Sequence, residues 1–82
     1  MELTVRVKLK EPLLARTAAS ITSRMAAYKS LVILKQKNLS VNAKSLMGVM
    51  SLGLLDGQTI TICANGVDEA EACCALAALL GA

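Results

Sequence analysis

Histidine is absent from this 82-residue chain. The chain therefore has no imidazole to serve as nucleophile, general base or metal ligand, the roles that histidine commonly fills near neutral pH. The sequence also has no glycine-rich phosphate loop and no paired carboxylates placed for acid–base catalysis. We therefore predict that the protein is not an enzyme, and we expect no catalytic residue, no metal and no cofactor.

Aromatic residues are almost absent as well, since the chain has no Trp, no Phe and only Tyr28. Hydrophobic residues nevertheless make up 55% of the sequence, so the core must be aliphatic, with Met and Ala filling the gaps. A chain of this length suffices for one small core. We expect a single domain over residues 1–82.

Basic residues are missing after Lys44, and the C-terminal half is acidic. The net charge of +3 is modest, and no aromatic residues alternate with the basic ones. Surfaces that bind single-stranded nucleic acid usually combine both features, so the sequence predicts no direct nucleic-acid binding.

The three cysteines, Cys63, Cys73 and Cys74, are an odd number without the spacing of a zinc site. Free thiols are typical of cytoplasmic proteins. The sequence also has no apolar run of about 20 residues and no signal peptide at its beginning. We therefore predict a cytoplasmic protein that does not bind a membrane.

The most distinctive stretch runs from Asn42 to Gly53 and places Ser45 directly before a short apolar segment. A Ser in this position is a good N-cap, and Gly53 is suited to end a helix. The apolar side chains of the segment are those of Leu46, Met47, Val49 and Met50. They cannot all face inward on a helix of two turns, so part of it should form an exposed apolar patch. The residues leave two interpretations of Ser45 open: a cap on a core helix, or a phosphorylatable serine in a docking surface.

Periodicity predicts seven elements in the order β-α-β-β-α-β-α. The expected strands are residues 2–9, 31–36, 39–42 and 58–64. The expected helices are residues 15–28, the short segment after Ser45, and 68–80 with Asp68 as its cap. Pro12 should end the first strand, residues 10–14 should form a loop, and Lys37-Asn38 a hairpin turn with Asn38 suited to positive φ. An α+β fold, a two-layer sandwich with an antiparallel sheet, buries the inner faces of all four strands.

Strand alternation places Leu31 and Ile33 on the sheet face away from the helices, near Thr61 and Cys63 if the second and fourth strands are neighbours. Isolated apolar residues on a surface are common. A contiguous apolar patch would instead favour self-association. Both interpretations are open, and we expect a monomer or a weak homodimer.

The run from Lys44 to Gly53, KSLMGVMSLG, resembles the regulatory-serine motif of the HPr family, the small phosphocarriers of the bacterial sugar phosphotransferase system. The run from Ala64 to Ala70 also fits that family, and the resemblance covers almost the whole chain. It implies an open-faced sandwich with sheet order 1-4-2-3 and three helices on one face.

The active-site run departs from the family, which places a phosphate-accepting His before Ala-Arg-Pro. Here Leu14 stands at the position of the His, Arg16 is retained, and Thr17 replaces the Pro. Leucine has no nucleophilic atom, so it cannot carry a phosphoryl group. The chain is therefore similar to the catabolite-repression HPr-like type, which lacks the His and keeps the Ser.

The resemblance implies a regulatory module that HPr kinase/phosphorylase phosphorylates on Ser45 and that acts as a corepressor partner of a catabolite control protein A-type regulator. We expect the partner-binding residues to be Arg16, Arg24, Leu46, Met47, Val49 and Met50. Two alternatives remain: a phosphocarrier of the phosphoenolpyruvate-dependent sugar phosphotransferase system, and a decoy that occupies the enzymes of that system without accepting phosphate.

Overall fold

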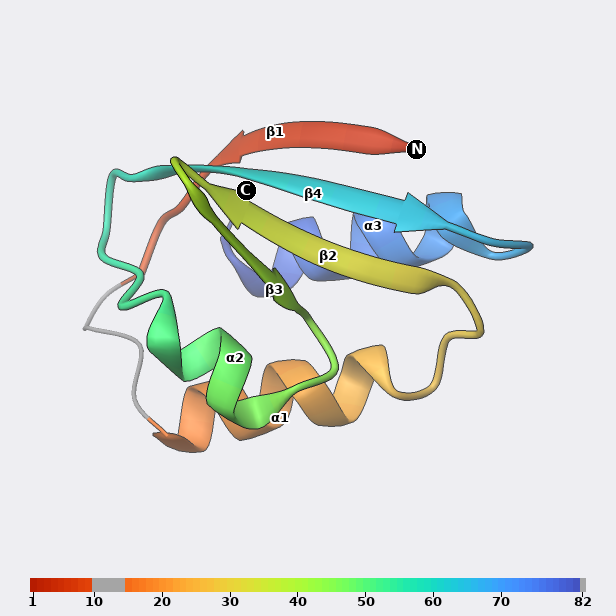
Figure 1. Ribbon diagram of the computed structural model, residues 1–82, viewed down its shortest axis with the longest axis horizontal. Helices are drawn as coiled ribbons and strands as arrows, with labels where there is room; N and C mark the ends of the chain where they lie inside the picture. The colour runs from red at the N-terminus through yellow and green to blue at the C-terminus, as the bar shows by residue number, and fades with distance from the viewer. Residues whose placement is uncertain (10–14, 82) are drawn as a thin grey trace.

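Three helices cover one face of a four-stranded antiparallel sheet in the computed structural model, which describes residues 1–9 and 15–81 (Figure 1). The strands are β1 (Glu2–Arg6), β2 (Leu31–Gln36), β3 (Leu39–Asn42) and β4 (Thr59–Asn65). The helices are α1 (Ala15–Met25), α2 (Leu46–Ser51) and α3 (Glu69–Leu79). The sheet order is β1-β4-β2-β3, so the predicted α+β fold with order 1-4-2-3 is confirmed.

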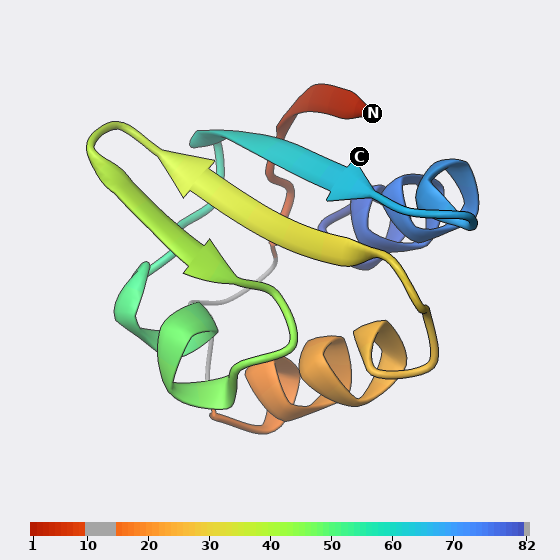
Figure 2. The same ribbon diagram turned by 45° about the vertical axis from the view of Figure 1, so that its right-hand side comes forward.

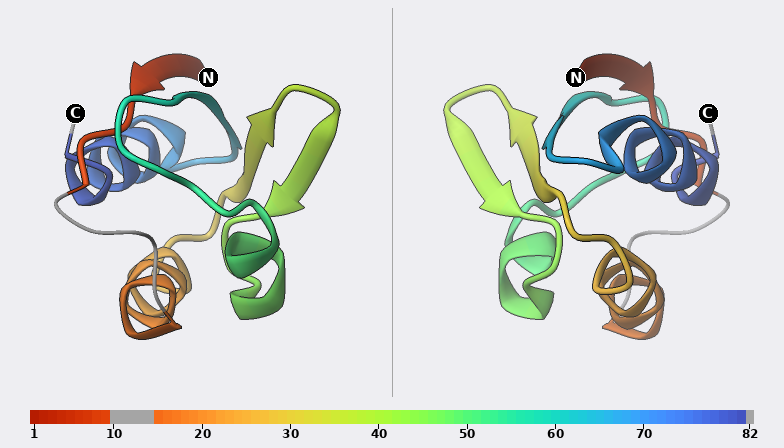
Figure 3. Two further views of the ribbon diagram at one scale, coloured as in Figure 1. Left: turned by 90° about the vertical axis from the view of Figure 1, so that its left-hand side faces the viewer. Right: turned by 90° about the vertical axis from the view of Figure 1, so that its right-hand side faces the viewer.

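The helices form two groups beneath the sheet. α2 packs against β3 and alongside α1, whereas α3 lies beneath β4 and β1 (Figure 2). The side views show that all three helices lie on the same face and leave the other face of the sheet bare (Figure 3). The fold thus has one helical surface and one open surface.

The core is aliphatic, as the composition predicts. Each central strand buries its alternate residues, Val32 and Leu34 in β2 and Ile60 and Ile62 in β4. The helices contribute the apolar stripes expected from their 3.6-residue period. Those stripes are Ala18, Ile21 and Met25 in α1, and Cys73, Leu76 and Ala77 in α3, followed by Leu80.

Several predicted boundaries are wrong by a few residues. β1 ends at Arg6 instead of residue 9, although Val7 is still buried. α1 ends at Met25 because the next turn tightens, with the Tyr28 N–H donating to the Met25 carbonyl at 3.1 Å. In the β2–β3 hairpin Lys37, not Asn38, has the positive φ, at 54°.

The predicted loop over residues 10–14, with Pro12 and Leu14, lies outside the described residues. Within residues 1–9 and 15–81, no helix is long and apolar enough to cross a membrane. The thiol of Cys73 is buried, which raises its pKa, and that of Cys74 is exposed.

Candidate functional site

Ser45 links β3 to α2 and is the N-cap residue of that helix. Its backbone is extended, with φ of −101° and ψ of 116°, and its Oγ accepts a hydrogen bond from the Gly48 N–H at 3.2 Å. The Ser45 carbonyl accepts from the Val49 N–H at 2.9 Å, which closes the first helical turn. The capping interpretation of Ser45 is confirmed, and the residue is only half-buried.

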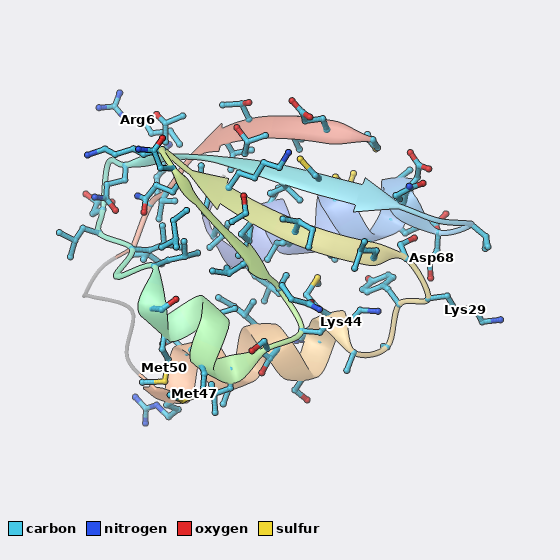
Figure 4. All side chains as sticks on the ribbon, in the orientation of Figure 1. Arg6, Lys29, Lys44, Met47, Met50 and Asp68 are labelled. Carbon is cyan, nitrogen blue, oxygen red and sulfur yellow. The ribbon has the colours of Figure 1, made fainter. Side chains whose placement is uncertain are left out.

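Asn42 and Lys44 hold the segment that leads into Ser45 in place. The Asn42 side-chain oxygen accepts from the Lys44 N–H at 2.8 Å, and the Asn42 carbonyl accepts from the Ser45 N–H at 3.0 Å. The Lys44 ammonium donates to the Tyr28 carbonyl at 2.6 Å, beyond the C-terminal end of α1 (Figure 4). The start of α2 is therefore fastened to the end of α1, which fixes the position of the Ser45 hydroxyl.

Gly48 lies directly under the Ser45 hydroxyl. A Cβ atom at Gly48 would lie 3.3 Å from the Ser45 Oγ and 3.3 Å from the Val41 Cβ. These distances are closer than ordinary van der Waals contact. The absence of a side chain thus lets α2 approach β3 and leaves space around the hydroxyl.

Three of the four apolar residues after Ser45 form an exposed patch. Met47 is 77% exposed, and Leu46 and Met50 are each 41% exposed. Figure 4 shows Met47 and Met50 together on the side of α2 near α1. We call Leu46, Met47 and Met50 the apolar patch.

The prediction that Val49 contributes to partner binding is wrong, because Val49 is fully buried. α2 packs against α1 and β3, so one side of this short helix must enter the core. Val49 occupies that side, and its burial helps to hold the apolar patch outward.

Arg16 and Arg24 are both exposed on α1, near its two ends. Eight helical residues separate them by about 12 Å along the axis and about 80° around it. The structure therefore does not bring the two arginines together, although both lie on the helix that packs beside α2. Thr17 is half-buried in the first turn of α1, and Leu14 lies outside the residues that the structure describes.

Asp68 accepts hydrogen bonds from a distant turn, and the sequence did not predict these contacts. Its side chain forms no capping bond in α3. It accepts hydrogen bonds from the N–H groups of Lys29 and Ser30, each at 2.9 Å, and from the hydroxyl of buried Ser30. The Ser30 hydroxyl, followed by the Lys29 N–H, lowers the pKa of Asp68 to about 2. The predicted side-chain cap is wrong because the carboxylate instead joins the β4–α3 turn to the α1–β2 turn (Figure 4).

The comparison with protein families identifies the class of protein that has this fold. The family described as the PTS HPr component phosphorylation site matches residues 1–82. The chain therefore belongs to the HPr family.

Individual relatives are of two kinds. The HPr-like protein Crh of Halalkalibacterium halodurans is 42% identical over 80 residues, which cover 98% of this chain and 95% of that protein. The crystal structure of the phosphocarrier protein HPr from Bacillus anthracis is similar at a TM-score of 0.92 and 39% identity, covering 98% of this chain and 95% of that one. The crystal structure of Crh from Bacillus subtilis, a catabolite repression protein described as a domain-swapped dimer, is 43% identical with a TM-score of 0.80. That match covers 94% of this chain and 88% of the Crh chain.

Proposed function

We propose that this protein is a regulatory member of the HPr family whose phosphorylation on Ser45 creates a binding surface in carbon catabolite control. The observation that carries the proposal is the combination of Leu14 at the phosphate-accepting position with an intact motif around Ser45. A chain that cannot carry a phosphoryl group on His can still display one on Ser.

The geometry of Ser45 suits that reaction. Its half-buried hydroxyl stands at the beginning of α2, and its one capping bond involves a backbone N–H and no other side chain. In the proposed reaction the Ser45 Oγ attacks the γ-phosphorus of ATP, ADP leaves, and the hydroxyl proton passes to a base of the kinase. The phosphate adds roughly −1.5 to −2 charges near neutral pH. Negative charge is favourable at the positive end of a helix, so the fold should tolerate it.

The proposed partner recognises charge and apolar surface together. A partner arginine or lysine would bind the phosphate, an apolar pocket would accept Met47, and Arg16 and Arg24 would contact the partner from α1. We propose HPr kinase/phosphorylase as the modifying enzyme and a catabolite control protein A-type regulator as the partner, both in the cytoplasm. Because Crh of Bacillus subtilis is described as a dimer, a weak homodimer is also part of the proposal.

Incubation with ATP and an HPr kinase tests the proposal. Intact-protein mass spectrometry should show one added phosphate, and Ser45→Ala should abolish it. Ser51→Ala is the matched control, because Ser51 is an exposed serine of the same helix whose hydroxyl donates to the Gly48 carbonyl at 2.6 Å. Phosphate on Ser51, or on any residue other than Ser45, would contradict the proposal.

Binding to the regulator tests the proposed interaction with the partner. Phosphorylated wild type should bind with measurable affinity, whereas the unmodified protein should bind at least about tenfold more weakly because the charge-assisted contacts are missing. Met47→Ser should weaken binding of the phosphorylated protein without reducing its phosphorylation. Equal binding of the phosphorylated and unmodified proteins would contradict the proposed role of phosphoserine, even if the apolar patch contacts the regulator.

A phosphocarrier is the second candidate, favoured by the likeness to the Bacillus anthracis phosphocarrier. Phosphoenolpyruvate and the general phosphotransferase enzyme would then place an acid-labile, transferable phosphate on the chain. We expect none, and Leu14→His alone should restore little acceptance, because Pro12 and Thr17 also depart from the family. If the chain competes with a true carrier without being labelled, it acts as a decoy.

A further inference from the structure

The open face of the sheet carries an apolar hollow far from Ser45. Leu31 is 55% exposed there, and Ile33 pairs across the sheet with half-buried Cys63. These residues line a hollow of about 480 Å³ together with Met1, Glu2 and Lys35. The predicted proximity of β2 and β4 on this face is confirmed, and it brings these apolar side chains together.

Cations lie toward the β2–β3 hairpin on the open face, and of these only Lys35 lines the hollow. Lys35 lines the hollow and is the next open-face residue of β2 after Ile33, about 7 Å along the strand. Lys37 follows in the hairpin turn, and exposed Arg6 stands at the end of β1 (Figure 4). None of these three cations forms an ion pair within residues 1–9 and 15–81.

One carboxylate lines the hollow itself. Glu2 lies at the end of β1 away from Arg6, where the Cys63 thiol donates to its carboxylate at 3.5 Å. Asp56, in the turn before β4, accepts the Leu9 N–H at 3.0 Å. The Arg6 Nε donates to the Gly57 carbonyl at 3.2 Å, and its terminal nitrogens donate no hydrogen bond to any residue that the structure describes. The open face thus has a hollow with apolar walls and one carboxylate, and three cations lie on the face toward the hairpin.

We propose that this open face is a second docking surface, and that its occupant is an acidic protein segment with an apolar anchor. The anchor would fill the hollow between Leu31, Ile33 and Cys63, while flanking carboxylates would contact Lys35, Lys37 and Arg6. Complementary charge favours this occupant. A second copy is disfavoured, because the cations of this face outnumber the one carboxylate of Glu2 and the whole chain carries a net charge of +3.

The open face is separate from the apolar patch of α2. The apolar patch lies on α2, one of the helices that cover one face of the sheet (Figure 3), whereas open-face residues of β2 and β4 line the hollow. A partner at one surface leaves the other free. The protein could therefore connect two proteins at once, and the open-face contact does not require a phosphate on Ser45.

A defined peptide tests the proposal in unmodified protein. The probe is a capped hexapeptide of two leucines with two glutamates on each side, titrated into isotope-labelled protein while amide shifts are recorded. We expect saturable shifts of β2 and β4 amides around Ile33, Lys35 and Cys63. The same peptide with lysines in place of glutamates should not bind, and the one with alanines in place of leucines should bind more weakly.

Variants make the test specific. Lys35→Glu should weaken peptide binding roughly tenfold, because an attractive charge becomes repulsive. Leu31→Thr with Ile33→Thr should remove the binding while keeping strand propensity. Met47→Ser is the matched control on the helical side and should leave peptide binding unchanged.

Three outcomes would overturn the proposal. The first is a set of peptide shifts that maps to α2 and is lost in Met47→Ser. The second is binding of the lysine peptide as tight as that of the glutamate peptide. The third is concentration-dependent dimerisation by sedimentation, under reducing conditions, that Leu31→Thr with Ile33→Thr abolishes, since a second copy would then occupy the face. The mapping on the wild type remains decisive if a variant fails to fold.

Discussion

Two helices of this protein start after a polar N-cap residue, yet the two residues serve different purposes. Ser45 caps its own helix, since its Oγ accepts the Gly48 N–H three residues later. Asp68 forms no such bond and accepts three hydrogen bonds from Lys29 and Ser30, residues 38 or 39 positions earlier. The Ser45 cap is a local contact. The hydrogen bonds of Asp68 with Lys29 and Ser30 join two distant turns, and we call them the Asp68 lock.

The difference explains why we expect the fold to tolerate a modification at Ser45 but not a change at Asp68. Phosphorylation of Ser45 would disturb one hydrogen bond in a six-residue helix. Loss of Asp68 would leave the buried Ser30 hydroxyl and two N–H groups without their acceptor. Unsatisfied buried donors are costly, so the Asp68 contacts support the fold, whereas the phosphorylation that we propose at Ser45 would leave them intact.

Gly66→Ala should break the lock with the largest effect. A Cβ at Gly66 would lie 2.6 Å from both the Cα and the Oγ of Ser30, so the backbone must move. We expect a loss of about 1–3 kcal/mol in the free energy of unfolding, measured by urea denaturation. Gly57→Ala is the control, because Gly57 also has positive φ, 86°, but nothing lies within 4 Å of its Cβ position. Equal losses in both variants would point to backbone strain instead of the Ser30 contact.

Asp68→Asn should weaken the lock in a pH-dependent way. The pKa of Asp68 falls from 3.8 to about 2 on folding, so its carboxylate stabilises the protein above the unfolded value. That contribution is lost as the pH falls through the folded pKa. The variant should be less stable than wild type at about pH 6, and the difference should shrink between about pH 4 and about pH 2. Glu69, whose pKa is lowered by the N-terminal amino group, titrates in both proteins and cancels. A difference that is constant over this range would contradict the assignment to Asp68.

Ser45→Ala should have a smaller effect because it removes only a local bond. Loss of an N-cap oxygen typically costs about 1 kcal/mol. Ser45→Asp keeps an acceptor in place and should stay near wild type in thermal unfolding monitored by circular dichroism. If Ser45→Ala destabilises the protein as much as Gly66→Ala does, the distinction between the two caps fails.

Gly48→Ala should change stability least and still affect the site. Alanine favours a helix over glycine by roughly 1 kcal/mol, but the crowding against the Ser45 Oγ and the Val41 Cβ offsets that gain. We expect a net change within about 0.5 kcal/mol by urea denaturation. Phosphorylation of Ser45 by the kinase should nevertheless slow, because the hydroxyl loses space. An unchanged rate would show that the space above Gly48 does not matter.

Much of the fold followed from local patterns. Alternation in residues 31–36 and 58–64 placed Val32, Leu34, Ile60 and Ile62 inside, and the structure confirms it. Ser45 was predicted as a cap because capping needs only a side-chain oxygen and an N–H three residues away. Such features depend on neighbours in the sequence, so the sequence alone determined them.

The tertiary structure decided which side chains meet across the fold. It buried Val49 because α2 packs on α1 and β3, and it left Met47 and Met50 outside. It also joined Lys44 to Tyr28 and turned Asp68 from its own helix to the α1–β2 turn. No local pattern encodes these pairings, because each depends on how distant segments approach once the core has formed.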